Sequence, residues 1–491
     1  TPKGMRGNGL ITFKTATTVS KNYLFKRWDI TADTAGFSLK NTYAQEGEDP
    51  LAFQAENVQA WISFKDRKGE FISNKGSSQI NFPVNQYLCR MDKFSWFMDY
   101  AEMQMEKSGE KDVTIDTDMD LVGPNFFSTH PNQDSLSFRS PKAKYDLKER
   151  SIYCEQVEYI EVGDARIFPD SMRVIIRQKA KLEHFNNAKV IANYLTKYHT
   201  FSEASIDILG KRSYNGNGRY PYYDKDSVLT YFIMDKINLD TSYRTVASGK
   251  IGQNDGFKLS KEFDYYGNVS IKADNPRISF AGATRINHDC SKFERNWMTF
   301  STEIDPSNIQ IPVSAKMKNL DGQPISAGIV WRHSNASDSI ALYPTFLSSL
   351  VSGDDPIVMT ADGYLQYNQS AKEFQIGSKD KLLNRSEKGN FLALHTESCS
   401  MQGEGVVNLG LDLADLTVDA VGTVSYNQTT GETAMNLTTR FNMAIDKGAM
   451  EGVADRINKV EGLQPMDMNS TTLEMALVEW TDQETADRFK S

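Results

Sequence analysis

The chain has 491 residues, which is too long for one ordinary hydrophobic core, so two to four domains or one long repetitive β-body are expected. A formal net charge of -9 argues against a nucleic-acid-binding protein, because affinity for a phosphate backbone needs clustered Lys and Arg. Hydrophobic residues make up 39% and aromatic residues 11%, a profile that favours β-structure with one solvated face over buried parallel sheets.

The sequence contains no transmembrane signal, because no stretch approaches the roughly 18 consecutive apolar residues that a spanning helix needs. It begins at Thr1 without Met and without a signal-like apolar run. We therefore expect a mature or excised piece of a longer protein.

Residues 1–106 are predicted to form a first β-unit. Gly7–Phe13 opens with two glycines and continues with apolar residues, and Val58–Phe64 alternates with the period of a strand. Asp66–Gly69 is typical of a hairpin turn. Met91–Met98 has helix-like spacing, and its aromatic residues are expected to plug the end of a core.

Residues 107–134 are predicted to be a linker or an exposed excursion, because they start with a polar and acidic stretch. Asp116, Asp118 and Asp120 alternate there and offer oxygen atoms that suit calcium. The segment lacks the glycine and the distant Glu of an EF-hand loop, so a solvated acidic segment is the preferred interpretation.

Residues 135–285 form a laddered segment in which a small residue is followed, two places on, by an apolar one. We call each such pair of residues a rung. Turn-forming residues separate the rungs, and the two residues of a rung point to the same face of a strand. Small residues on one edge let stacked layers approach closely. The apolar members are the candidate lining of a ligand groove: Ile167, Leu182, Val190 and Ile206.

A second β-block is predicted over residues 286–442, with a strong hairpin signal at Val424–Gly431. Residues 443–491 are predicted to be a C-terminal helical cap, because Met443–Asn458 and Thr471–Lys490 carry helical spacing. Ser470 lies in a polar cluster that suits the start of the second helix. The fold class is therefore mainly β: an elongated, layered antiparallel structure, as a β-solenoid, a folded sheet or stacked sandwiches, with a short helical region at its end.

No catalytic or metal site is predicted. The glycine pairs lack the third glycine and the following helix of a dinucleotide fingerprint, and the six histidines are dispersed. No cofactor is expected. The four cysteines, none in a CxxC pair, are expected to be buried thiols, with one disulfide as the alternative if the chain is exported.

A carbohydrate-binding or glycan-processing surface protein is the alternative hypothesis, because exposed aromatic rings stack on sugars. The candidate rings are Trp61, Trp331, Tyr220 and Tyr222, although each is more often a packing residue. Glycosidase chemistry needs two carboxylates across a cleft, and the sequence alone does not select a pair among 64 acidic residues.

Three stretches, Phe82–Tyr87, Tyr159–Asp170 and Phe263–Val269, resemble large uncharacterised cell-envelope proteins of Bacteroidota. The β-layers in turn loosely resemble the OstA/LptA-type folded sheet of lipopolysaccharide transport, an open stack with an apolar groove for acyl chains. The resemblance implies a periplasmic or outer-membrane-associated protein, with lipid or lipopolysaccharide and other envelope proteins as partners.

A short motif is consistent with export in such an organism: Asp, then Ser or Thr, then an apolar residue resembles the O-glycosylation signal of Bacteroidota. It starts at Asp33, Asp134, Asp170, Asp226 and Asp338. The leading hypothesis is a non-enzymatic envelope scaffold or binding protein that offers an apolar β-groove to a lipid or a partner strand within a larger assembly.

Overall fold

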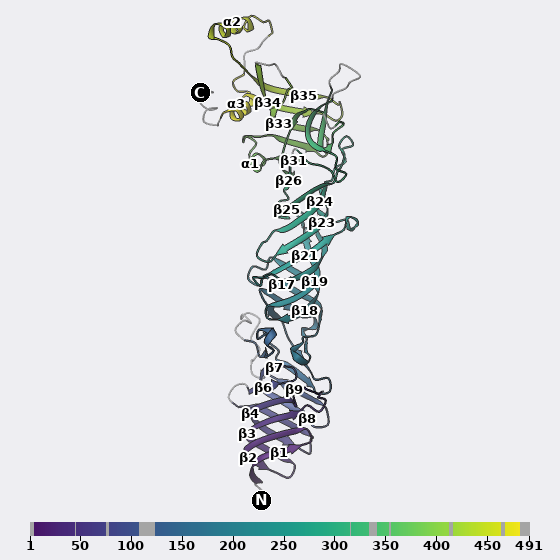
Figure 1. Ribbon diagram of the computed structural model, residues 1–491, viewed down its shortest axis with the longest axis vertical. Helices are drawn as coiled ribbons and strands as arrows, with labels where there is room; N and C mark the ends of the chain where they lie inside the picture. Colours follow the sequence, from purple (N-terminus) through teal and green to yellow (C-terminus); the bar gives the residue numbers. More distant parts are fainter. Residues whose placement is uncertain are drawn as a thin grey trace. The chain divides into compact units, whose positions relative to one another are not determined.

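The computed structural model describes residues 4–44, 46–74, 78–107, 123–314, 316–332, 341–352, 355–411, 416–462 and 467–481. The chain forms two compact units. Unit 1 comprises Thr1–Tyr222, Leu229–Lys250 and Ser270–Pro276, and unit 2 comprises Tyr223–Val228, Ile251–Val269 and Arg277–Ser491. Large antiparallel sheets make up most of the described residues, which confirms the mainly β fold with a short C-terminal helical region (Figure 1). The boundaries of the five segments expected from the sequence stay predictions.

The strands that begin in unit 1 are β1 (Met5–Phe13), β2 (Ala16–Phe25), β3 (Asp29–Lys40), β4 (Leu51–Ser63), β5 (Lys68–Ser73), β6 (Ser78–Phe82), β7 (Tyr87–Met91), β8 (Lys93–Phe97), β9 (Glu102–Glu106), β10 (Phe126–Ser128), β11 (Ser137–Phe138), β12 (Lys142–Asp146), β13 (Ser151–Glu155), β14 (Ile160–Val162), β15 (Ala165–Phe168), β16 (Val174–Ile176), β17 (Phe185–Ala192), β18 (His199–Gly210), β19 (Ser213–Tyr223), β20 (Leu229–Leu239) and β21 (Thr245–Ile251). Short 3₁₀ turns lie at Pro131–Gln133, Asp170–Met172 and Gln178–Ala180.

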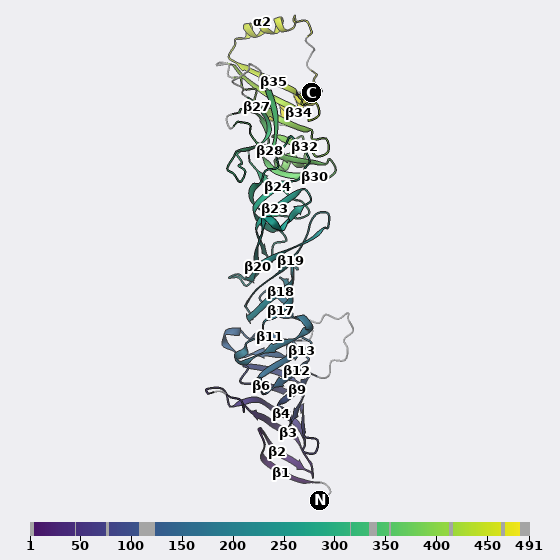
Figure 2. The same ribbon diagram turned by 90° about the vertical axis from the view of Figure 1, so that its right-hand side faces the viewer.

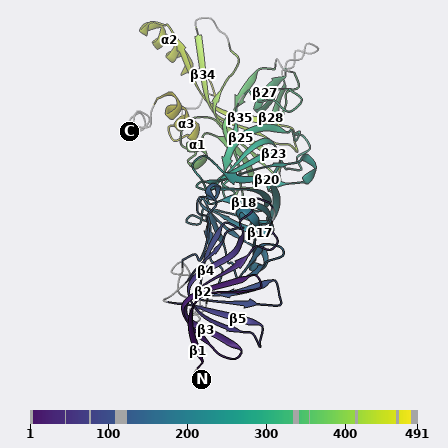
Figure 3. The same ribbon diagram turned by 60° about the horizontal axis from the view of Figure 1, so that its bottom comes forward.

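Unit 1 begins as one antiparallel sheet, in which β1, β2, β3 and β4 pair in chain order (Figure 3). The sheet divides at β4, because the first half of this strand pairs with β6 and the second half with β5. Asn57 lies at the division with φ 57°, a left-handed conformation that Asn tolerates better than most residues and that bends the strand. The long strand β4 therefore pairs with the first strand of each of two series of hydrogen-bonded strands, which we call ladders.

The chain then alternates between the two ladders, usually two strands at a time. The first ladder runs β5, β8, β9, β12, β13 and β16. The second runs β6, β7, β10, β11, β14, β15 and β17. Inward side chains of both ladders meet, since Phe82 of β6 packs against Tyr145 of β12 with ring centroids 5.1 Å apart. The two ladders therefore share an interior.

Two sequence-based expectations fall in this region. Residues 93–97 form the strand β8, so the helix predicted over Met91–Met98 is wrong, whereas its aromatic side chains do lie in the core. Phe94 and Trp96 are two residues apart and both buried, which is the spacing of a strand face. Residues 126–128 of the predicted linker form β10 in the second ladder, and the acidic stretch with Asp116 lies outside the described residues.

The strands that begin in unit 2 are β22 (Lys258–Ser260), β23 (Phe263–Lys272), β24 (Ile278–Ile286), β25 (Met298–Ile304), β26 (Ile311–Val313), β27 (Ile325–Arg332), β28 (Ala341–Ser349), β29 (Ile357–Thr360), β30 (Gly363–Asn368), β31 (Glu373–Gly377), β32 (Phe391–His395), β33 (Met401–Val407), β34 (Leu416–Tyr426) and β35 (Thr433–Met443). Its helices are α1 (Lys379–Leu383), α2 (Lys447–Ile457) and α3 (Thr471–Trp480), with a 3₁₀ turn at Gln253–Asp255.

Unit 2 contains a seven-stranded sheet, in the order β26, β30, β31, β32, β33, β34 and β35, and a three-stranded sheet of β28, β27 and β29. The hairpin predicted around Val424–Gly431 is confirmed as β34–β35. Ser470 is the N-cap of α3, as the sequence predicted. Helix α3 lies against β34 in Figure 1, and Leu473, Leu477 and Val478 are buried there.

Candidate functional site

The four candidate groove residues are all buried inside unit 1. Ile167, Val190 and Ile206 are 0% exposed and Leu182 is 5% exposed. Ile167 of β15 lies directly opposite Val190 of β17, so these two are neighbours. Ile206 instead pairs with Phe185 of β17, and Leu182 bridges to Ile176 of β16. A lipid chain therefore finds no exposed surface at these four positions.

The small residues of the rungs explain how this interior closes. Ala188 of β17 and Ala204 of β18 lie opposite one another and are both 0% exposed. A Cβ added at Gly218 of β19 would lie 3.1 Å from the Cβ of Ala204, so the next strand also approaches closely. Close approach was the role predicted for the small residues, and here it fills the space that a groove would need.

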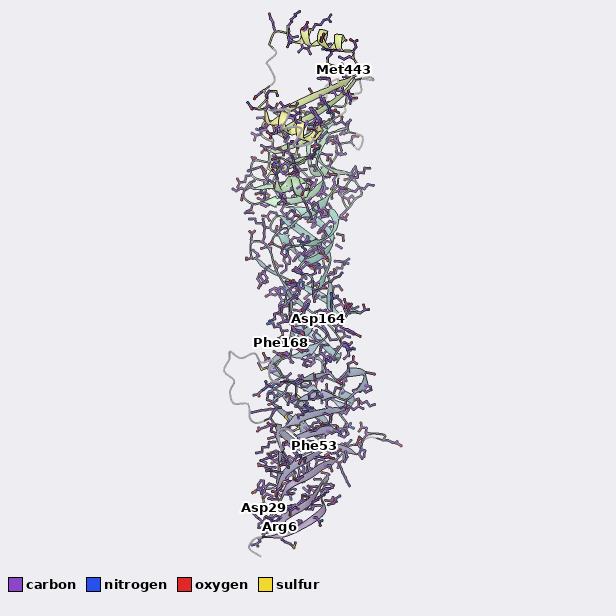
Figure 4. The ribbon with its side chains drawn as sticks, turned by 90° about the vertical axis from the view of Figure 1, so that its left-hand side faces the viewer. Arg6, Asp29, Phe53, Asp164, Phe168 and Met443 are labelled. Carbon is purple, nitrogen blue, oxygen red and sulfur yellow. A yellow bond between two sulfur atoms is a disulfide. The ribbon has the colours of Figure 1, made fainter. Side chains whose placement is uncertain are left out.

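The interior nearer to β1 is filled by aromatic rings. Phe94 of β8 stacks on Phe71 of β5 with centroids 4.6 Å apart. Phe37 of β3 lies 4.3 Å from Phe71, and Phe53 of β4, labelled in Figure 4, lies 5.1 Å from Phe94. All four rings are at most 2% exposed. Aromatic clusters of this kind stabilise a core and leave little room for a ligand.

The candidate sugar-stacking rings do not form a surface. Tyr222 is 1% exposed, and Tyr220 is 7% exposed and stacks on Phe232 with centroids 5.2 Å apart. The Tyr220 hydroxyl lies 2.8 Å from Nδ1 of His199, and burial lowers the pKa of that histidine. Trp61 of β4 in unit 1 and Trp331 of β27 in unit 2 are both half-buried.

The titratable groups with the largest pKa shifts lie within the core. Burial raises the pKa of the Tyr87, Tyr145 and Tyr214 hydroxyls well above their usual range. It also raises the pKa of the Cys89 and Cys154 thiols, which are both fully buried, and each thiol is therefore held protonated. These groups face side chains of the interior, and desolvation is the main cause of each shift.

Strand β1 is an accessible feature of unit 1. It pairs with β2 along its length, and its other edge has no partner strand among the described residues. None of its nine residues is buried, and Met5 and Leu10 are 69% and 65% exposed. Phe13 at its end packs on Phe64, with centroids 5.1 Å apart, and so reaches the end of the interior. The strand contains no Pro, and Arg6 is its one charged residue.

A hollow of about 1010 Å³ lies over the outer face of strands β1 to β4. It forms where Gly9 and Gly36 present no side chain, and Val19, which is 50% exposed, lies between these strands on β2. Leu10 pairs with Val19, so the edge strand and the hollow share one apolar surface. The sequence of Gly7–Phe13 predicted a strand but not its exposure. The apolar run after two glycines, with no charge to interrupt it, was the available signal.

Unit 2 contains a disulfide between Cys290 and Cys399, which are 109 residues apart in sequence. The bond joins the segment after β24 to the turn between β32 and β33. The nearby His288 is 7% exposed, its Nδ1 accepts a hydrogen bond from the Cys290 amide at 3.2 Å, and burial lowers its pKa to about 4. Of the two expectations for cysteine, buried thiols hold for Cys89 and Cys154, and the disulfide alternative holds for the other pair.

The motifs that resemble an O-glycosylation signal lie at the surface. Thr34, Ser135, Ser171 and Ser227, which carry the hydroxyls, are all exposed. Three of these four have left-handed backbone conformations, with φ between 56° and 61°. The fifth motif, at Asp338, lies outside the described residues. An enzyme that modifies hydroxyls would therefore have access to each of the four.

Among the residues that the structure describes, no helix has the length and apolar character that a membrane-spanning helix needs. The same residues contain no group of three or more His, Cys, Asp or Glu side chains placed to hold a metal ion.

Comparison with known proteins gives little. No family model matches the chain, and no curated protein matches it. A solved structure of PorZ, an essential bacterial surface component of the type-IX secretion system of Porphyromonas gingivalis, aligns over 87% of this chain and 75% of PorZ. The identity is 9% and the TM-score is 0.12, which is too low to support a shared fold. The likeness to the OstA/LptA-type sheet stays a prediction.

Proposed function

We propose that this protein is a non-enzymatic scaffold of the bacterial cell envelope, and that its β1 edge takes up an extended strand of a partner protein within a larger assembly. The observation that carries the proposal is the exposed edge of β1 at the end of a closed interior. An unpaired edge offers a row of backbone N–H and C=O groups, and a partner strand satisfies them by pairing.

The composition of β1 supports this role. Natural edge strands that must stay unpaired carry inward charges, Lys, Pro or bulges that resist further pairing. Here Leu10 to Phe13 contains none of the charged or Pro blockers, and the register irregularity of the β1–β2 pair lies earlier, between Gly7 and Gly9. An arriving strand with alternate apolar residues would cover Leu10 and extend the sheet.

The filled interior favours a protein partner over a lipid. The groove candidates are 0–5% exposed, so a bound acyl chain would have to displace packed side chains. The carbohydrate-binding alternative loses the support of Tyr220 and Tyr222, because both rings are buried.

Two observations support an extracytoplasmic location. Structural disulfides persist in oxidising compartments, and Cys290–Cys399 is such a bond. The four described glycosylation-like motifs present their hydroxyls to solvent.

Hydrogen–deuterium exchange of the purified full chain tests the proposal. The probe is a synthetic ten-residue peptide with the β2 sequence Ala16–Phe25, which already pairs with β1 in the fold. We expect the peptide to slow exchange of the β1 amides, because those that face the free edge become hydrogen-bonded. A peptide of the same composition in scrambled order should not slow it.

A matched pair of variants locates the binding. Leu10→Lys places a charge on the edge strand, and Leu195→Lys places it at a 78% exposed position elsewhere in unit 1. We expect Leu10→Lys to abolish the protection by the peptide and Leu195→Lys to leave it unchanged. Equal protection in both variants, or none in the wild type, would contradict strand addition at β1.

A further inference from the structure

A serine, a histidine and an aspartate are hydrogen-bonded in series on the solvated face of unit 1, where β17 and β18 begin to pair. Nε2 of His184 lies 2.7 Å from the Ser205 hydroxyl, and Nδ1 of the same ring lies 2.9 Å from Oδ1 of Asp207. Strands β17, β18 and β19 lie side by side there (Figures 1 and 2). A hydroxyl, an imidazole and a carboxylate joined in this order activate a serine as a nucleophile, and the arrangement is recognised by its geometry whatever the fold or chain order.

The register of the two strands explains how the three side chains meet. Phe185 of β17 pairs with Ile206 of β18, and both side chains are buried. His184 and Asp207 are the next residues outward, so they lie opposite one another on the solvated face. Ser205 is two residues from Asp207 on β18 and therefore points to the same face, within reach of the imidazole.

The carboxylate determines which ring nitrogen carries the proton. A carboxylate accepts hydrogen bonds, so Nδ1 of the neutral imidazole donates to Asp207 and Nε2 keeps its lone pair. The Ser205 hydroxyl then donates to Nε2, which is the direction needed for Ser205 to lose its proton when it attacks. The His184 and Asp207 side chains are 39% and 53% exposed and Ser205 is half-buried, so a small reagent reaches the hydroxyl.

A fourth side chain is placed to bind the negative charge that develops during the attack. Asn217 of β19 lies directly opposite Ser205 and is exposed. Opposite residues on paired strands have Cβ atoms about 4.5–5.5 Å apart, so the Asn217 amide is within reach of the carbonyl oxygen of an ester held at Ser205. A side-chain amide is one of the donors that stabilise such an oxyanion. Gly216 keeps β19 close at this point, because an added Cβ would clash with the Ser205 carbonyl oxygen.

A serine–histidine pair in unit 2 lacks this arrangement. The Ser398 hydroxyl lies 3.1 Å from Nδ1 of His395, and the Ser398 amide donates to the same nitrogen, also at 3.1 Å. In the part of the chain that the structure describes, no carboxylate is hydrogen-bonded to the other ring nitrogen of His395. Ser398 is exposed and beside an imidazole, so it serves as an internal control for Ser205.

We propose that Ser205 is an acylation site that attacks a short-chain ester or thioester, with His184 as the general base and Asp207 as the residue that positions the ring. The Ser205 Oγ forms a bond to the carbonyl carbon, its proton moves to Nε2 of His184, and the oxyanion accepts a hydrogen bond from Asn217. The bond from that carbon to the leaving oxygen or sulfur then breaks, and the proton on Nε2 passes to the leaving atom. The product is an acyl ester of Ser205.

The polar surroundings favour a short acyl group. Asn217 lies opposite Ser205 and Asn215 lies opposite Asp207, and both amides are exposed. A long alkyl chain laid on these amides would bury little apolar surface and gain little free energy. The reaction leaves one acyl group on each chain and needs no turnover. It therefore adds a covalent modification to the scaffold, and it does not depend on the β1 edge.

Mass spectrometry of the purified full chain, after incubation with p-nitrophenyl acetate, tests the proposal. We expect peptide mapping to find the first acetyl group on Ser205, well before Ser398 is acetylated. Ser205→Ala should abolish this acetylation, and Ser398→Ala should leave its rate unchanged. Acetyl groups spread over exposed lysines, with none on Ser205, would overturn the proposal.

The rate of Ser205 acetylation in further variants separates the roles of its neighbours. His184→Gln keeps a polar side chain but removes the base, and should slow the reaction at least ~100-fold. Asn217→Ala should slow it by a smaller factor, roughly tenfold, because the site is solvated. Equal rates in the wild type and in His184→Gln would show that the imidazole does not activate Ser205, and would overturn the proposal.

Asp207 is tested by the contrast between two replacements. Asp207→Asn should slow acetylation, because an amide that donates to Nδ1 leaves the proton on Nε2, where it blocks the base. Asp207→Glu restores a carboxylate and should regain part of the rate. Both variants should melt at the wild-type temperature, since the side chain is at the surface. Equal rates in the two variants would contradict the positioning role.

Discussion

The middle of unit 1 and its first strand differ in how their apolar residues are used. Ile167 and Val190, in the middle, are 0% exposed between two ladders, whereas Leu10 of β1 is 65% exposed beside an open edge. Both regions are antiparallel strands that carry apolar side chains. The repeated pattern of a small residue followed by an apolar one therefore specifies core packing. A binding surface is expected where the packed core ends.

The largest effect is expected inside the interior. Phe94→Ala removes a ring that stacks on Phe71 and contacts Phe53, and should lower the free energy of unfolding by about 3–5 kcal/mol. Leu10→Ala on the edge should change it by less than ~0.5 kcal/mol. Urea unfolding of both variants measures this contrast. Similar losses in the two would mean that the β1 end is as tightly packed as the middle.

Unit 2 should respond to a covalent change that leaves unit 1 intact. Replacing Cys290 and Cys399 by Ser removes a bond that closes a long loop, and should destabilise unit 2 by about 2–5 kcal/mol. Unit 1 holds Cys89 and Cys154 as thiols, so reductant should leave its unfolding unchanged. Amide exchange of each unit, with and without dithiothreitol, separates the two responses. A loss of protection in unit 1 would contradict this prediction.

A pH effect of intermediate size is expected in unit 2. His288 has a pKa of about 4 in the fold because it is buried, and about 6.5 when unfolded. The unfolded state therefore binds more protons between these values, so stability is full above pH 6.5 and falls as the pH drops towards 4. His288→Asn retains an acceptor for the Cys290 amide but does not titrate. Denaturation between pH 7 and pH 4.5 should show a smaller loss in this variant, and an equal loss would exclude His288 as the cause.

The smallest effect on stability is expected for Leu10→Lys. The side chain is mostly solvated, so the free energy of unfolding should change by less than ~0.5 kcal/mol. A lysine on an edge strand nevertheless opposes further pairing. The melting temperature of Leu10→Lys, which should no longer bind the β2 peptide, should therefore equal that of the wild type. A large drop in melting temperature would show that β1 belongs to the packed core.

Sequence periodicity was sufficient to predict the mainly β fold, because alternation along segments such as Val58–Phe64 reflects burial on one side of a strand. Periodicity gave the wrong prediction at Met91–Met98, because several aromatic residues close together also fit helical spacing. Residues 93–97 form a strand because they pair with β5 and β9. The β34–β35 hairpin and the helical regions were predicted because turn residues and caps act locally.

The candidate site was beyond what one sequence determines. The alternation that places Ala165 and Ile167 on one face of β15 does not say whether a second layer covers that face, and here it is covered. The exposure of Leu10 depends on which strand is last in the sheet, which is a property of topology. The pairing of Cys290 with Cys399 likewise depends on contacts across 109 residues.

Native mass spectrometry of the protein purified from its own cells, before and after extraction with organic solvent, tests the closed-interior scaffold most directly. We expect the mass of the polypeptide, with any covalent modification, to be unchanged by extraction. A lipid adduct that is lost on extraction would contradict it, because the interior would then have to open around an acyl chain.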